Sequence, residues 1–142
     1  MHGCLEAGEK MTIALWCVLI AILLPYVCFG IARNRGRGPD GRRLRDNHHP
    51  RDFPDRIRGV ARRAWDAQLN SFESLPGFAA AVIIAHLVHA PQHPVDALAV
   101  VWVVARAAYV VFYVADKAAL RSTAQFISLA CVLGLFVMAG LA

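Results

Sequence analysis

The feature that most constrains this chain is an uncharged, apolar run of 22 residues from Met11 to Ala32. At 1.5 Å per residue a helix of this length reaches about 33 Å, close to the thickness of the hydrocarbon core of a bilayer. Three similar stretches follow, so the expected spans are about 11–32, 69–90, 95–115 and 122–142. Only 18% of the residues are charged, which is low for a soluble domain. The sequence therefore predicts an all-α fold, with residues 1–142 forming a single integral membrane domain and a four-transmembrane-helix bundle.

The first span is longer than the apolar core of a signal peptide, and it leads directly into a run of arginines. We therefore interpret it as a retained helix, in which Pro25 is tolerated because neighbouring helices satisfy the freed carbonyl. The first ten residues carry little structural signal. The sequence is compatible with a start at either Met1 or Met11.

The loop after the first span, residues 33–63, contains 11 of the 15 basic residues, all of them arginines. Since four aspartates share this loop, its net charge is +7, against +5 for the whole chain. Loops rich in arginine stay in the cytoplasm, so we expect both termini on the opposite side of a bacterial inner membrane. The same charges favour anionic lipid. Nucleic-acid binding is not expected, because no aromatic platform accompanies the arginines.

The cysteines and histidines do not predict a metal or disulfide site. Cys17, Cys28 and Cys131 lie within apolar stretches and no two cysteines share a CxxC spacing, which is typical of packing residues. Three histidines lie near the end of the second span, but Pro91 should end that helix before a third ligand is reached. No metal is therefore assigned.

Charged residues within the spans are the most informative about function. Glu73 and Arg106 each cost several kcal/mol in hydrocarbon unless they are paired or face a polar cavity. We predict that they pair, because a long arginine side chain can close their offset of about 8 Å in depth. Two roles remain open for the pair: a structural bridge that sets helix register, and part of a reactive site.

Polar residues around this pair recur at helical spacing and predict two stripes that face a common interior. The stripes are Asn70, Glu73 and Gly77 on the second span, and Arg106, Tyr109 and Tyr113 on the third. Gly77 and Ala81 also form a pair of small residues at a spacing that lets another helix approach closely.

The start of the fourth span resembles a capping box, in which Ser122 caps the helix and Gln125 reaches back to it. Arg121 would then lie beside a helix N-terminus whose amides favour anions, where it could hold a carboxylate or stabilise a thiolate. An arginine that only fixes the membrane topology is an equally good interpretation.

These motifs together resemble the MAPEG family, membrane-associated proteins in eicosanoid and glutathione metabolism. The resemblance rests on RAWDAQLNSFESLPGF at 63–78, RAAYVVFY at 106–113 and the pair Arg121-Ser122, and it extends from about Arg56 to the end. The segment DNHHPR at 46–51 is similar to uncharacterised bacterial members. The family resemblance implies a four-helix protomer, a homotrimer, and glutathione bound between subunits at the cytoplasmic side.

The resemblance also assigns roles to the polar residues of the spans. The implied cofactor-binding residues are Asn70, Glu73, Arg106, Tyr109, Tyr113 and Ser122. Arg121 is the implied catalytic residue, since it would activate the thiol. Two positions depart from the family pattern: Asp66 replaces an arginine and Gln68 replaces a common histidine. An acid at position 66 would repel the carboxylates of glutathione.

Two functions therefore follow from the sequence. The first is a membrane-bound glutathione-dependent transferase or peroxidase that acts on lipophilic electrophiles, with partners that are a second and third copy of the chain, membrane lipids and a lipophilic small molecule. The alternative is a non-catalytic MAPEG-like membrane protein that binds a different amphipathic ligand or none. Asp66 favours the alternative, whereas Arg106, Tyr113 and Arg121 favour the enzyme.

Overall fold

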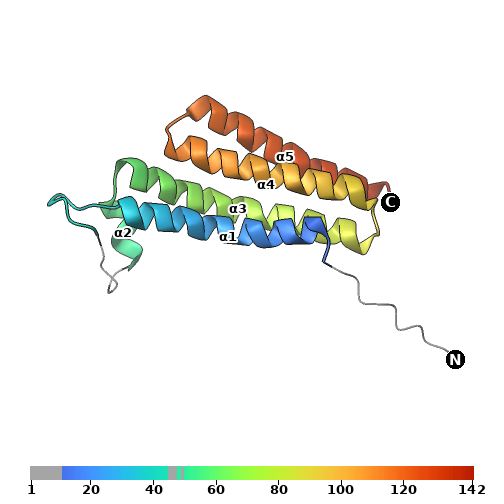
Figure 1. Cartoon of the computed structure of the whole chain (residues 1–142), viewed down its shortest axis with the longest axis horizontal. Coiled ribbons are helices and arrows are strands. Elements are labelled where there is room, and N and C mark those ends of the chain that lie inside the picture. The colour runs from blue at the N-terminus through green and yellow to red at the C-terminus, as the bar shows by residue number, and fades with distance from the viewer. Residues whose placement is uncertain (1–10, 45–47, 49) are drawn as a thin grey trace.

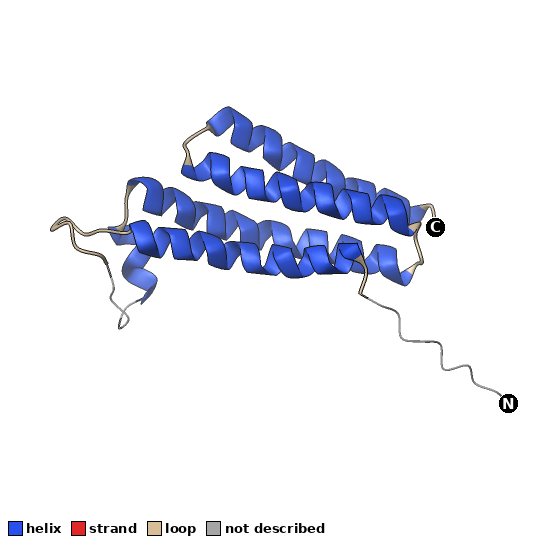
Figure 2. Ribbon diagram, in the orientation of Figure 1, coloured by secondary structure: helices blue, strands red, loops and turns tan. Residues whose placement is uncertain are grey.

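The computed structural model describes residues 11–44, 48 and 50–142, and these are mainly helical (Figure 2). The four long helices are α1 (Ile13–Arg35), α3 (Gly59–Leu87), α4 (Gln92–Val114) and α5 (Ala118–Gly140), and two short elements, η1 (Pro50–Asp52) and α2 (Phe53–Arg56), lie between α1 and α3. The predicted all-α fold with four long helices is confirmed. Residues 1–10, and half of the segment at 46–51 that is similar to bacterial members, lie outside the described residues.

Three of the long helices, α1, α4 and α5, are long and apolar enough to cross a membrane. Among the described residues α3 is not in this group, although its 29 residues exceed the length needed. Its N-terminal half carries several charged residues, of which Arg63, Asp66 and Glu73 fall within three turns. The helix predicted at 69–90 therefore exists, and it is more polar than the other three.

The bundle consists of two helix pairs (Figure 1). α1 packs along α3, α4 packs along α5, and contacts of α3 with α4 and α5 and of α1 with α4 join the pairs. The loop after α1 and the α4–α5 turn lie toward one end of the bundle, whereas the C-terminus and the start of α1 lie toward the other (Figure 1).

Small side chains fill the contact between α1 and α3. The buried residues of α1 are Ala14, Cys17, Ala21, Pro25, Cys28 and Ala32. They meet a row of alanines on α3 that includes Ala61, Ala64 and Ala67, so the two backbones can approach closely where no hydrophobic effect drives association. Cys17, Cys28 and Cys131 are buried and free, which confirms their interpretation as packing residues.

A parallel aromatic stack joins α3 to α4 in the middle of the core. The rings of Phe78 and Trp102 lie 3.8 Å apart between centroids with an interplanar angle of 3°, and both are buried. Gly77, one position earlier, is exposed, and a Cβ atom there would have no neighbour within 4 Å. The predicted close helix approach at Gly77 is therefore wrong within the protomer, although Ala81 is fully buried.

Both tight turns between helices use a non-glycine residue in the left-handed region. α3 ends at Leu87, three residues before its predicted end, because His89 adopts φ 55° and Ala90 N–H returns to Ala85 O at 2.9 Å. This is a Schellman motif. α4 then begins at Gln92, directly after a proline, rather than at residue 95.

The second turn corrects the predicted start of the fourth helix. Asp116 adopts φ 62° and Lys117 N–H donates to Phe112 O at 2.8 Å, so α5 begins at Ala118 instead of Ser122. Ser122 lies inside the helix, where its hydroxyl donates to Ala118 O at 3.1 Å. The predicted capping box is therefore wrong, because two alanines and a leucine, which favour helices strongly, precede the serine.

Polar side chains bind the ends of neighbouring helices. The carboxylate of Asp96 on α4 accepts the amide of Ala14 in the first turn of α1 at 2.8 Å. At the other end Arg63 on α3 donates to Val114 O at 3.1 Å and lies 3.7 Å from the Asp116 carboxylate. These contacts satisfy backbone groups that helix ends leave without partners, and those of Arg63 fix the end of the bundle that carries the polar site.

Candidate functional site

A polar pocket of about 320 Å³ opens between α3, α4 and α5 near the end that carries the long loop. Its lining residues are Asn70, Tyr109, Tyr113, Arg121, Ser122, Gln125 and Phe126. Five of the seven residues proposed from the sequence are in this lining. The other two, Arg106 and Glu73, each contact Asn70. The structure thus brings the stripe of α4 and the start of α5 together with Asn70 and Glu73 of the other stripe, whereas Gly77 does not line the pocket.

Arg106 is the centre of this cluster and has no exposed surface. Its Nη1 donates to Gln125 Oε1 at 2.6 Å, and its Nη2 donates to Asn70 Oδ1 at 2.9 Å and Ser71 Oγ at 3.4 Å. The guanidinium carbon lies 4.2 Å from the centroid of the Tyr109 ring, within the range of a cation–π contact. One side chain therefore connects all three helices of the pocket.

The predicted direct pair between Glu73 and Arg106 is wrong. No ion pair joins them in the part of the chain that the structure describes; Glu73 is exposed and accepts a hydrogen bond from Asn70 Nδ2 at 3.3 Å. The amide of Asn70 lies between the two charges, because its oxygen accepts from Arg106 while its nitrogen donates to Glu73. The Asn70 amide therefore bridges the two charged side chains by one hydrogen bond to each.

The charge of Arg106 has only neutral partners among the described residues. Its hydrogen bonds go to two amides and a hydroxyl, and its Nε is buried with no hydrogen-bond partner. A buried cation without a counter-charge is costly, and hydrogen bonds offset only part of that cost. Since the pocket lining contains no carboxylate, its electrostatics favour an anionic ligand.

Arg121 supplies a second cation to the same pocket. Its guanidinium carbon lies 4.6 Å from the centroid of the Tyr113 ring, and Tyr113 meets Tyr109 edge to face at 5.6 Å between centroids. The two tyrosines thus form a continuous aromatic support beneath both arginines. Arg121 is in the first turn of α5, where the N-terminal end of the helix dipole adds positive potential.

Three residues of the cluster were not assigned to it from the sequence: Gln125, Ser71 and Phe126. Gln125 was placed in the capping box, yet it lies four residues after Arg121 on the same helix face. That spacing is the signal that could have identified it. Ser71 and Phe126 carry no comparable signal, because serines and phenylalanines are common in membrane helices.

The two departures from the family pattern have different outcomes. Asp66 does not line the pocket. Its carboxylate accepts a hydrogen bond at 3.0 Å from Nε of Arg62, which lies one turn earlier on the same helix. The expected repulsion is therefore countered by a neighbouring cation. Gln68 has a buried Oε1 with no hydrogen-bond partner in the described chain.

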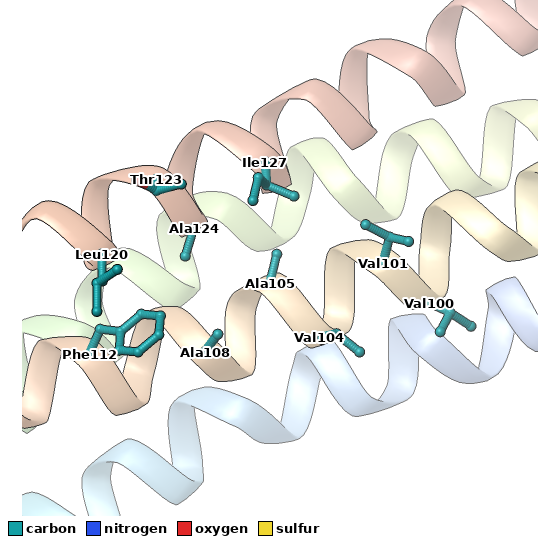
Figure 3. Close-up of a pocket in the computed structure, with 10 residues that line it drawn as sticks. All are labelled: Val100, Val101, Val104, Ala105, Ala108, Phe112, Leu120, Thr123, Ala124 and Ile127. Atoms are coloured by element: carbon teal, nitrogen blue, oxygen red, sulfur yellow. The ribbon is translucent and has the colours of Figure 1, made fainter.

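A second cavity, here called the apolar groove, lies between α4 and α5 (Figure 3). It measures about 380 Å³ and is lined by Val100, Val101, Val104, Ala105, Ala108, Phe112, Leu120, Thr123, Ala124 and Ile127. At 100° per residue, the residues of α5 that line it project opposite to those that line the polar pocket. The first turns of α5 therefore separate a polar cavity from an apolar one.

Comparison with known proteins agrees with this arrangement. Residues 13–141 match the model of the MAPEG family. No curated protein matches the chain. Because the family match covers all four long helices and both sides of the polar pocket, the chain belongs to the MAPEG family.

Proposed function

We propose that this protein is a membrane-bound, glutathione-dependent transferase or peroxidase that acts on lipophilic electrophiles. The observation that carries the proposal is the fully buried Arg106, which has no carboxylate partner in the described chain and lies behind a pocket that also holds Arg121. A pocket with one arginine in its lining, a second arginine directly behind it and no acid in the lining fits a ligand with two carboxylates and a thiol.

The residues present fit glutathione by their chemistry. The two arginines supply positive charge for its carboxylates, and the hydroxyl groups of Ser122 and the tyrosines supply further donors. Glu73, held beside Asn70, supplies the negative charge that an α-ammonium group requires. Both signs of charge are therefore available within one site.

Glutathione would supply the nucleophilic sulfur, and the chain would hold it in reactive form. A thiolate attacks, whereas a thiol does not, and a nearby guanidinium stabilises the thiolate. Tyr113 supports Arg121 by the cation–π contact at 4.6 Å, so the cation is held in position before a ligand binds. Arg121 is for this reason the proposed catalytic residue, and the other members of the cluster bind and orient.

The proposed working form is a homotrimer in a bacterial inner membrane, with both termini away from the cytoplasm. Glu73 is exposed on α3 beside exposed apolar residues such as Leu69 and Phe72. A charged side chain facing lipid is costly, so a neighbouring subunit would stabilise the protein by covering this face. The proposed second substrate is a lipophilic compound that enters from the membrane; within one chain the apolar groove lies on the opposite side of α5 from the polar pocket and would not hold it beside the thiol.

The rival proposal is a non-catalytic member that binds another amphipathic ligand or none, and the departure from the family pattern at Asp66 favours it, although Arg62 counters the charge of that carboxylate. Calorimetric titration of glutathione into the detergent-solubilised full chain separates the two. The enzyme proposal expects binding that Arg121→Ala weakens about tenfold or more, together with loss of the ultraviolet thiolate absorbance.

A matched control for this titration is Arg51→Ala, since Arg51 is exposed on η1 and does not line the pocket.

Asp66→Arg should tighten glutathione binding if the site is a weakened glutathione site. No glutathione binding by the wild type or by Asp66→Arg would contradict the enzyme proposal and leave the rival.

A further inference from the structure

The loop that follows α1 contains an ordered cluster of arginines that the proposed function does not use. Two overlapping cavities of about 580 and 620 Å³ lie between the turn at 37–44 and the segment at 55–58. We call the two cavities together the arginine groove. Their lining residues are Arg37, Gly38, Pro39, Asp40, Arg42, Arg43, Leu44, Asp55, Arg56 and Arg58. Five arginines against two aspartates give the lining a formal charge of +3.

A folded backbone holds these arginines in place. Gly38 N–H donates to Arg42 O at 2.8 Å and Leu44 N–H donates to Gly36 O at 3.2 Å, which closes the turn, and Gly41 takes the required positive φ of 75°. The other wall is anchored by Ile57, which is fully buried. Its Cγ2 lies 3.1 Å from the position of a Cβ on Gly36, so the two walls contact each other directly.

Four of the five guanidinium groups of the groove, those of Arg37, Arg42, Arg43 and Arg58, retain capacity to bind an anion. Arg37 and Arg58 donate only to backbone carbonyls, which leaves their charge without a carboxylate partner in the described chain. Arg43 has no hydrogen bond or ion pair to any described residue. The guanidinium of Arg42 makes a loose, exposed contact of 3.9 Å with the Asp40 carboxylate. Guanidinium forks suit phosphate oxygens, with which they form two parallel hydrogen bonds.

The position of the groove points to the membrane as the source of that phosphate. α1 is apolar enough to span the membrane and ends at Arg35. The groove begins two residues later, at Arg37. Beside it, Phe29 and Phe53 both pack edge to face on Trp65, at 6.2 and 5.8 Å between centroids. Aromatic residues gather at the level of the headgroups, and this cluster places the groove there.

We infer that the arginine groove binds the headgroup phosphate of an anionic phospholipid in the adjacent leaflet. Leu44 and Pro39 in its lining would contact the glycerol and upper acyl carbons. Single-stranded nucleic acid is a poorer fit, because the lining holds no aromatic side chain on which a base could stack. The experiment must distinguish a specific site from general electrostatic attraction between the arginine-rich loop and an anionic membrane surface.

The test uses the full chain in mixed micelles with fluorescent phosphatidylglycerol, read by anisotropy, and fluorescent phosphatidylcholine as the neutral comparison. The triple variant Arg37→Gln, Arg43→Gln, Arg58→Gln should weaken phosphatidylglycerol binding by about tenfold or more. The matched triple variant Arg35→Gln, Arg51→Gln, Lys117→Gln removes the same charge from exposed positions outside the groove. It should weaken binding less than about threefold, as expected for a distant charge effect that salt screens.

Equal losses in the two triple variants would overturn the groove and leave only diffuse attraction. Displacement of the lipid by millimolar inorganic phosphate, or tighter binding of a short single-stranded RNA than of phosphatidylglycerol, would overturn the choice of ligand. If the groove variant fails to fold, Arg43→Gln alone decides, because the Arg43 side chain has no hydrogen bond or ion pair to a described residue that the substitution would remove. It should weaken binding by about fivefold with an unchanged melting temperature, and unchanged binding would contradict the inference.

Discussion

Replacing Gln125 by leucine tests whether Arg106 is held by amides and not by Glu73. The substitution removes the acceptor 2.6 Å from Arg106 Nη1 and leaves a buried, charged donor without a partner. Hydrogen bonds to charged groups contribute about 1.5–3 kcal/mol to stability, so we expect Gln125→Leu to destabilise the protein by about 2 kcal/mol. At roughly 2–4 °C per kcal/mol, the melting temperature in detergent should fall by about 4–8 °C.

Two comparison variants make this result specific. Glu73→Gln should cost less than about 1 kcal/mol, because Glu73 is exposed and contacts only Asn70, at 3.3 Å. Thr123→Val removes a polar group from α5 that bonds only within its own helix, and should change stability by less than about 0.5 kcal/mol.

A double-mutant cycle then measures the contact itself. Combined with Arg106→Leu, the Gln125→Leu change should cost about 1–2 kcal/mol less than it does alone, because replacing both partners leaves no unpaired donor. Two single effects that simply add within about 0.5 kcal/mol would refute the contact. A larger loss of stability from Glu73→Gln than from Gln125→Leu would instead support a direct ion pair between Glu73 and Arg106.

Three further predictions concern the helix ends and the membrane topology. Asp96→Ala should lower stability by about 1–2 kcal/mol in thermal unfolding, because the amide of Ala14 loses its acceptor; no change would show that water replaces it. His89→Gly should raise the melting temperature by the equivalent of about 1 kcal/mol, since glycine adopts φ 55° without steric cost, and a decrease would contradict this. A periplasmic reporter fused after Ala142 should be active and a cytoplasmic one inactive; the reverse pattern would contradict the predicted orientation.

The fold was largely predictable because each long helix has its own sequence signal. Apolar length identified the four helices, and the spacing of Arg106, Tyr109 and Tyr113 correctly put one stripe on one helix face. Helix ends were less predictable. The preference of serine for caps at Ser122 was outweighed by the helix-forming alanines before it and by the left-handed Asp116, which no local pattern distinguishes from an ordinary loop residue.

Contacts between distant segments were the part that the sequence could not supply. Asp96 meets the amide of Ala14, 82 residues earlier, and nothing near Asp96 in the sequence indicates that partner. The partner of Arg106 was misassigned because charge complementarity favoured Glu73, whereas the packing of α5 places an amide nearer. Opposite charge identifies a possible partner, and only packing decides which polar group is reached.

The polarity of α3 has a consequence for how the chain enters the membrane. Of the long helices in the described chain, α3 is the one that is not apolar enough to cross by composition alone. Charged residues raise the cost of partitioning from the translocon into lipid. α3 therefore depends on α1, whose row of small side chains receives it, and on α4, whose Arg106 binds Asn70. We therefore expect this helix to integrate cooperatively with its neighbours, so a nascent chain that ends before α4 should leave α3 partly outside the bilayer.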